Sequence, residues 1–142
     1  MYKIEKKHYG LYVTMQSLYS ADEMKTYLQE KDRMLAQFDG PFSIIVDLRS
    51  AIPPDKRDEQ LLEENHAHLR EHGLQRMAIV VDSPVVQMQA KQILSNAGIR
   101  DRTRIINAAK FPDWEERALN WVLYAIEPES SSESTHIYEG AV

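Results

Sequence analysis

The sequence contains no cysteine, so disulfide bonds, thiol nucleophiles and thiolate metal sites are all excluded. It also has no excess of positive charge: the net charge of -5 over 142 residues argues against a general nucleic-acid binder. No apolar run approaches the roughly 18 residues that span a bilayer, and the N-terminal stretch lacks the apolar core of a signal peptide. We therefore expect a cytoplasmic protein with neither a membrane nor a nucleic-acid partner.

The motifs of the common enzyme classes are missing as well. There is no Gly-rich phosphate loop, no G-x-S-x-G elbow, and no set of Ser, His and Asp whose mutual placement can be argued. Four of the five glycines already fit turns or helix ends, and the fifth lies near the C-terminus. We expect no cofactor and no catalysis, and an unrecognised hydrolase is the least favoured alternative.

Hydrophobic patterning predicts five strands. Residues 2–17 alternate weakly about Tyr9 and Gly10, which indicates a β-hairpin. The runs at 43–48 and 77–81 are too uniformly apolar to have one wet face, as is typical of strands covered on both sides. A shorter run at 103–106 predicts the fifth strand.

Four helices are predicted between and after these strands. The first follows a capping pattern of Ser20 and Glu23. The second runs from about residue 55 to 72, and beyond a narrow leucine stripe its residues are expected to face water or a partner. The apolar positions expected to be buried are Met24, Tyr27, Leu28, Leu35 and Phe38 in the first helix, and Leu61, Leu62 and Leu69 in the second.

The third helix begins after Ser83 and Pro84 and ends on Gly98, and the fourth begins after Pro112. Their expected buried positions are Val86, Ala90, Ile93, Leu94 and Ala97 in the third, and Trp114, Ala118, Trp121, Val122 and Ala125 in the fourth. The order β-β-α-β-α-β-α-β-α predicts an α/β fold with a mixed five-stranded sheet over residues 1–126. Residues 127–142, acidic and rich in serine, are predicted to form a disordered tail.

This element order, with VDLRSAIPPDKRDEQ after the third strand, MAIVV in the fourth and FPDWEERALNWV near the end, resembles the STAS domain family, the anti-sigma-factor-antagonist fold. The likeness is greatest to stand-alone bacterial members. In regulatory members, a strand ending in an L-D-L-like triplet leads to an Asp-Ser-Ser-Gly-like motif with a phosphorylated serine. Placing the triplet on residues 46–48 puts the motif's aspartate on Asp55, with Lys56, Arg57 and Asp58 in place of the serines and the glycine. Without a hydroxyl no phosphoester forms, so the resemblance implies a regulatory domain that is not switched at this position.

The loop after the third strand is the expected partner-binding surface, together with the exposed side of the second helix. Ile52 is the best candidate for an exposed apolar contact, and a protein partner of unknown identity is the preferred hypothesis. A homodimer is a second option, because the opening hairpin is expected at a sheet edge. The partner-binding candidates are Arg49, Ser50, Ile52, Asp55, Lys56 and Arg57.

The alternative hypothesis is a carrier or sensor of a small apolar or anionic molecule, bound beside the carboxyl ends of strands three and four. Asp47 and Asp82 each close one of these strands, and Ser83 with Pro84 presents free N–H groups at a helix start. For both aspartates, hydrogen bonding to the following loop or helix start is the preferred interpretation over a cation site.

Two further hypotheses are less favoured. His68 and His72 lie four residues apart and share a helix face, as in zinc sites, but no third ligand is evident at a suitable offset. Arg49, Lys56 and Arg57 could form a basic rim for a phosphate or an acidic partner, and this hypothesis includes a second basic segment as an extension of the rim. That segment contributes Arg100, Arg102 and Arg104.

Overall fold

The computed structural model describes residues 1–16 and 21–129. Five strands form one sheet in the order β1-β2-β3-β4-β5, which places β1 at an edge and β3 in the middle. β1 and β2 are antiparallel, and β2 to β5 are parallel, so the predicted hairpin and mixed five-stranded sheet are confirmed. The strands are β1 (Tyr2–Lys7), β2 (Gly10–Met15), β3 (Phe42–Asp47), β4 (Leu74–Val81) and β5 (Thr103–Asn107).

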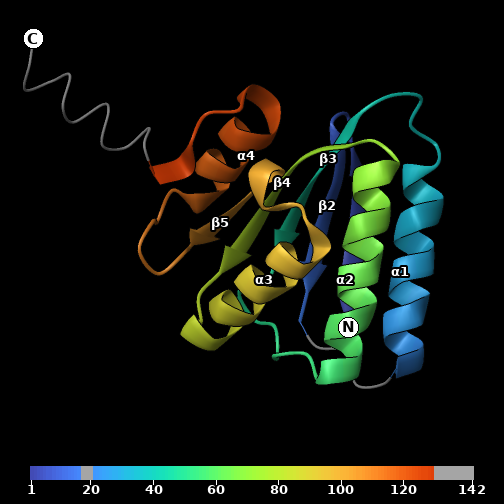
Figure 1. Cartoon of the computed structure of the whole chain (residues 1–142). Coiled ribbons are helices and arrows are strands. Elements are labelled where there is room, and N and C mark those ends of the chain that lie inside the picture. Colours follow the sequence, from blue (N-terminus) through green and yellow to red (C-terminus); the bar gives the residue numbers. More distant parts are fainter. Residues whose placement is uncertain (17–20, 130–142) are drawn as a thin grey trace, which may run out of the picture.

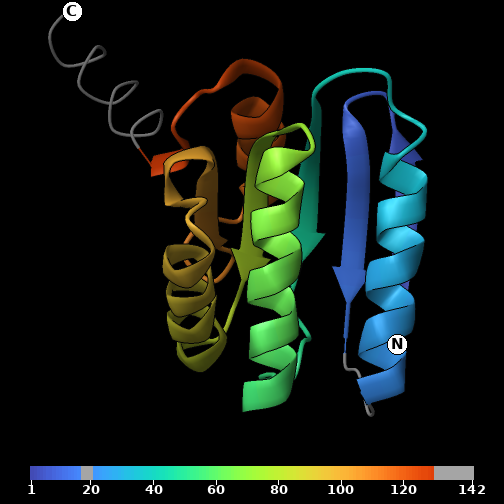
Figure 2. The same ribbon diagram turned by 45° about the vertical axis from the view of Figure 1, so that its right-hand side comes forward.

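Four helices cover the two faces of the sheet unequally (Figure 1). The first three lie side by side on one face and the fourth lies on the other, an arrangement that Figure 2 shows with the three-helix layer in front. The short 3-10 helix η1 (Arg100–Arg102) leads into β5. The helices are α1 (Ala21–Leu35), α2 (Lys56–Glu71), α3 (Pro84–Ala97) and α4 (Trp114–Tyr124). None of the helices in this described part of the chain is long and apolar enough to cross a membrane.

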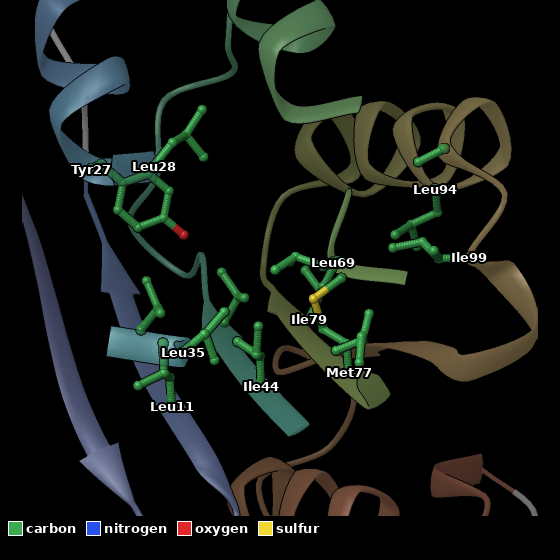
Figure 3. Close-up of a cluster of buried hydrophobic side chains, with 14 of the residues drawn as sticks. Leu11, Tyr27, Leu28, Leu35, Ile44, Leu69, Met77, Ile79, Leu94 and Ile99 are labelled. Carbon is green, nitrogen blue, oxygen red and sulfur yellow. The ribbon is translucent and has the colours of Figure 1, made fainter. Parts of the chain in front are cut away.

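The hydrophobic core is divided by the sheet into two clusters. The larger lies under α1, α2 and α3, and Figure 3 shows Leu11, Ile44, Met77 and Ile79 of the sheet facing side chains of these helices. The smaller lies under α4, where the Trp121 indole N–H donates to the Met77 carbonyl at 3.0 Å. All six residues of β3 are buried, as expected for a strand covered on both faces.

Helix α3 forms as its sequence predicts. Ser83 is the N-cap and accepts from the Val86 N–H at 3.4 Å, while Gly98 ends the helix with a left-handed φ of 74°. The helix thus ends at a glycine, which adopts the left-handed conformation at little cost in free energy. Its buried residues are those predicted: Val86, Ala90, Ile93, Leu94 and Ala97.

The start of β4 and the burial of Ala125 differ from the prediction. β4 begins at Leu74 rather than Met77, because the Arg76 guanidinium finds a partner in the Val122 carbonyl of α4 at 3.1 Å, and a polar residue is therefore tolerated in the strand. Ala125 was expected on the buried face of α4, and this prediction is wrong. It is exposed and is the C-cap, with a φ of 57°.

At the C-terminal end of the described residues, the Arg104 guanidinium contacts both carboxylate oxygens of Glu127 at 2.8 Å. Residue 127 therefore contacts the folded body. Most of the predicted tail, residues 130–142, lies outside the described residues, as does Ser20 of the first capping pattern.

Candidate ligand-binding site

A cavity of about 230 Å³ lies between the layer of α1, α2 and α3 and the carboxyl ends of β3 and β4. The loop that follows β3 forms one of its walls. Most lining side chains are apolar, with a small number of polar groups among them, the composition of small-molecule sites. The cavity is lined by Met15, Gln16, Met24, Tyr27, Val46, Leu48, Ala51, Ile52, Pro53, Pro54, Asp55, Asp58, Leu62, His66, Ile79, Val86, Gln89, Ala90, Ile93 and Leu94.

Hydrogen bonds to three elements hold the loop over the cavity. The Leu48 N–H donates to the Val80 carbonyl at the end of β4, at 2.8 Å. The Ile52 N–H donates to the Gln16 carbonyl after β2, at 2.9 Å, and the Gln89 side chain of α3 donates to the Pro54 carbonyl at 3.3 Å. The loop is therefore positioned by β2, β4 and α3 together, yet the Ile52 side chain is 61% exposed at its surface.

One face of α2 supplies polar groups to the cavity. Asp58, Leu62 and His66 are spaced four residues apart, so they lie in one row along the helix. Asp58 is 7% exposed and His66 is 8% exposed. The expectation that α2 buries only a narrow leucine stripe is therefore wrong, since polar residues share the buried face with Leu69.

Asn65 belongs to the same buried face. Its side-chain amide donates to both carboxylate oxygens of Asp32 on α1, at 3.2 Å each. This contact ties α2 to α1 beside the cavity, and Lys31, also buried, lies with its ammonium 5.0 Å from the centre of the Tyr27 ring. The α1–α2 contact thus combines polar and apolar groups.

Three buried polar atoms of the cavity wall have no hydrogen-bond partner within the described residues: Asp58 Oδ1, His66 Nδ1 and Gln89 Oε1. The orientation of the Gln89 amide is fixed, because its nitrogen donates to the Pro54 carbonyl and to Glu59 Oε1, leaving the oxygen on the other side. Buried polar atoms in folded proteins are normally hydrogen-bonded, so we expect a hydrogen-bond partner for each of these three atoms. The cavity is where that partner would be found.

The electrostatics of the wall follow from burial. Burial raises the pKa of Asp58, and the nearby Asp55 raises it further. Burial lowers the pKa of His66 to about 3, with Lys31 adding to the effect, so the imidazole is neutral at pH 7. Burial also lowers the pKa of Lys31, to about 8. Among the described residues that line the cavity, none is a lysine or an arginine.

The strand-closing aspartates lie outside the cavity lining. Asp47 is buried and pairs with Arg49, whose Nε and Nη2 each lie 3.0 Å from a carboxylate oxygen. The Arg49 guanidinium in turn lies 4.1 Å from the centre of the Trp114 ring of α4, so this pair belongs to the opposite face of the sheet. Asp82 is exposed, and Ser83 is engaged as the α3 cap. For Asp47 and Ser83, the structure shows hydrogen bonds within the protein.

The remaining loop candidates are mainly on the outer surface. Ser50, Lys56 and Arg57 are exposed, and Arg57 Nη2 lies 3.9 Å from Asp55 Oδ2. Asp55 is the N-cap of α2, where it accepts from the Asp58 N–H at 2.8 Å. Asp55 and Ile52 are the two partner-binding candidates that also line the cavity.

The two basic segments do not form one rim. Arg100, Arg102 and Arg104 precede or begin β5, at the amino end of the parallel strands, whereas Arg49 follows the carboxyl end of β3. Arg102 Nη1 donates to the Leu74 carbonyl at 2.9 Å. The proposed joint basic rim is therefore wrong, because the sheet separates its two halves.

His68 and His72 stack on the exposed side of α2, with ring centroids 3.9 Å apart. The His72 Nδ1 atom lies 2.8 Å from the His68 carbonyl oxygen. Over residues 1–16 and 21–129 no group of three or more His, Cys, Asp or Glu residues is placed to hold a metal ion.

Sequence reasoning missed Asp58, His66 and Gln89, although the sequence carried a signal for two of them. Asp58 and His66 are in phase with Leu62 and Leu69 along α2. A search of protein-family models and a search of curated proteins both found no match to this chain. The case for a function therefore rests on the cavity.

Proposed function

We propose that this protein is a non-catalytic carrier or sensor that binds a small, mainly apolar molecule in the cavity beneath the loop after β3. The single observation that carries the proposal is the cavity of about 230 Å³, with an apolar lining and three polar atoms that have no hydrogen-bond partner among the described residues. An interior normally fills such a volume with side chains. Here small or short residues such as Ala51 and Ala90 stand at the wall instead.

The size of the cavity bounds the ligand. An engineered apolar cavity of about 150 Å³ accepts benzene, so 230 Å³ scales to a molecule of about nine non-hydrogen atoms. Eight-carbon chains with one polar end group, such as 1-octanol, have this size. They serve as probes for the natural ligand.

The test is a thermal-unfolding screen with a panel of straight-chain and aromatic compounds of this size, including 1-octanol. A compound at ten times its dissociation constant adds about 1.4 kcal/mol to the free energy of unfolding. For a chain of 142 residues this raises the Tm by about 5 °C. Isothermal titration calorimetry then gives the dissociation constant of each compound that raises the Tm.

The matched variant is Ala90→Leu. Ala90 lines the cavity and is 7% exposed, so a leucine there occupies the ligand volume while keeping a helix-forming residue. The control is Ala36→Leu, at an exposed position after α1. We expect Ala90→Leu alone to abolish the Tm shift. The proposal fails when no compound of the panel raises the Tm, or when Ala90→Leu responds like the wild type.

We also infer that the fold is of the STAS type. The succession of a hairpin, a helix and three strand–helix units, with α1, α2 and α3 on one face, supports this inference. When the Asp-Ser-Ser-Gly-like motif of the STAS family is placed on this sequence, Asp58 stands at the position of its glycine. Asp58 also lies in the cavity wall. A ligand would then take the place of the phosphorylated serine as the regulating signal.

A second candidate function is the binding of a protein partner through the loop. The observation that favours it is Ile52, which is 61% exposed between Ala51 and Pro53. Loops held in place by a rigid scaffold commonly carry binding residues, and Ile52 stands on such a loop. Because Ile52 also lines the cavity, ligand and partner would meet at the same loop.

A further inference from the structure

The polar atoms of the cavity wall lie in two places. Asp58 and Gln89 are at the loop end, where the Gln89 amide also contacts the Pro54 carbonyl. His66 is eight residues further along α2, which is about 12 Å by the rise of an α-helix. Leu62 lies between Asp58 and His66 along α2, and apolar residues of α3 line the same cavity. A single polar group of a ligand would therefore meet either the loop end or His66.

The carboxylate at the loop end differs from the other buried aspartate of the described residues. Asp47 is neutralised by Arg49, which contacts both of its oxygens. Asp58 has no ion pair within 4.0 Å in the same part of the chain, and its Oδ1 atom is buried without a hydrogen-bond partner. A buried carboxylate without a counter-ion is costly, and proteins normally pair it.

The cavity wall carries a second negative charge near Asp58. Asp55 also lines the cavity, and no lysine or arginine does among the described residues. Burial and Asp55 raise the pKa of Asp58, whereas the exposed Arg57 lowers it. A cation at Asp58 Oδ1 would supply the missing charge, and Gln89 Oε1 is a second acceptor at this end of the cavity.

Resting on the proposed binding role of the cavity, we infer that its ligand is an apolar amine whose protonated nitrogen donates to Asp58 and Gln89. The hydrocarbon part lies along Leu62, Ile93 and Leu94 in the direction of His66. A carboxylate or phosphate group is disfavoured at the loop end, because it would meet Asp58 and Asp55 with the same charge, and no lysine or arginine among the described residues lines the cavity to offset it. The anionic ligand considered from the sequence is thus disfavoured.

Three probes of equal length separate these alternatives: 1-octylamine, 1-octanol and octanoate. Their dissociation constants are measured at pH 7 by calorimetry on the wild-type protein. The amine is expected to bind at least tenfold more tightly than octanoate, with the alcohol between them. Asp58→Asn should reduce the ratio of amine to acid to below about threefold, because the amide keeps the shape of the side chain and removes its charge.

Asp82→Asn is the matched control, since it removes the same charge from an exposed position outside the cavity lining. It should leave the wild-type ratio unchanged. Equal or tighter binding of octanoate in the wild type overturns the inferred ligand class, while the cavity remains a binding site. Absence of binding by all three probes overturns the binding role itself. Because the wild-type ratio decides between these outcomes, the test stands even where Asp58→Asn is unstable.

Discussion

His66 should make the stability of the protein depend on pH between 5 and 7. Its imidazole is 8% exposed, and burial with the neighbouring Lys31 lowers its pKa to about 3. In the unfolded chain the pKa of a histidine is about 6.5. Between these two values the unfolded chain binds one proton more than the folded protein, so the free energy of unfolding falls as the pH falls.

The magnitude follows from the two pKa values. At pH 7 both states are mainly neutral at this position, and at pH 5 the unfolded chain is protonated while the folded protein is not. The linkage relation then gives a loss of about 2 kcal/mol between pH 7 and pH 5. Lys31 adds little in this interval, because its pKa of about 8 keeps it mainly protonated in both states.

The assay is urea unfolding at both pH values for the wild type, His66→Leu and His68→Leu. His66→Leu removes the buried titrating group and should lose about 2 kcal/mol less than the wild type on going from pH 7 to pH 5. His68 is exposed on the same helix, so its variant should behave like the wild type. Carboxylates titrate alike in all three proteins and cancel in the comparison. Equal losses in the wild type and His66→Leu would refute the buried, neutral state of His66.

Two further predictions concern β2 and the loop. Gly10→Ala should lower the free energy of unfolding by more than about 3 kcal/mol in urea titrations, because a Cβ atom there would lie 1.9 Å from the Ser43 carbonyl oxygen. Gly40→Ala, with nothing within 4 Å of the added carbon, should change it by less than about 0.5 kcal/mol, and equal effects would contradict the close packing of β2 on β3. Ile52→Glu should leave the Tm within error, since the side chain is 61% exposed, while weakening self-association or partner binding in sedimentation experiments. Unchanged association would remove Ile52 as a contact.

The elements that the sequence predicts well are those in which one physical effect dominates. In α3 a serine cap, a first-turn proline and a terminal glycine agree with the apolar spacing, so its ends and buried face are all predicted correctly. β3 is equally clear, because an uninterrupted apolar run leaves no face for water. In both segments, local preference and tertiary burial point the same way.

The buried face of α2 is predicted wrongly for the opposite reason. Asp58, Asn65 and His66 are polar residues whose burial depends on partners from α1 and α3 or on a cavity, neither of which is visible in the local sequence. A polar residue in phase with leucines is compatible with an exposed face or with a polar site inside the protein. Only the packing of α1 and α3 against α2 decides between them.

The position of the site depends on the alternation of side chains between the two faces of β3. Val46 lines the cavity beneath α1, α2 and α3, and the next residue, Asp47, points to the opposite face, where Arg49 and Trp114 lie. The cavity thus lies at the carboxyl end of a parallel strand, while the aspartate that closes the strand points to the opposite face of the sheet. The loop lines the cavity again at Leu48 and from Ala51 onward, and its acidic groups come at the start of α2, where Asp55 caps the helix and Asp58 lines the cavity. Because the cap fixes the first turn, it also fixes the direction of the one buried aspartate that lacks an ion pair among the described residues.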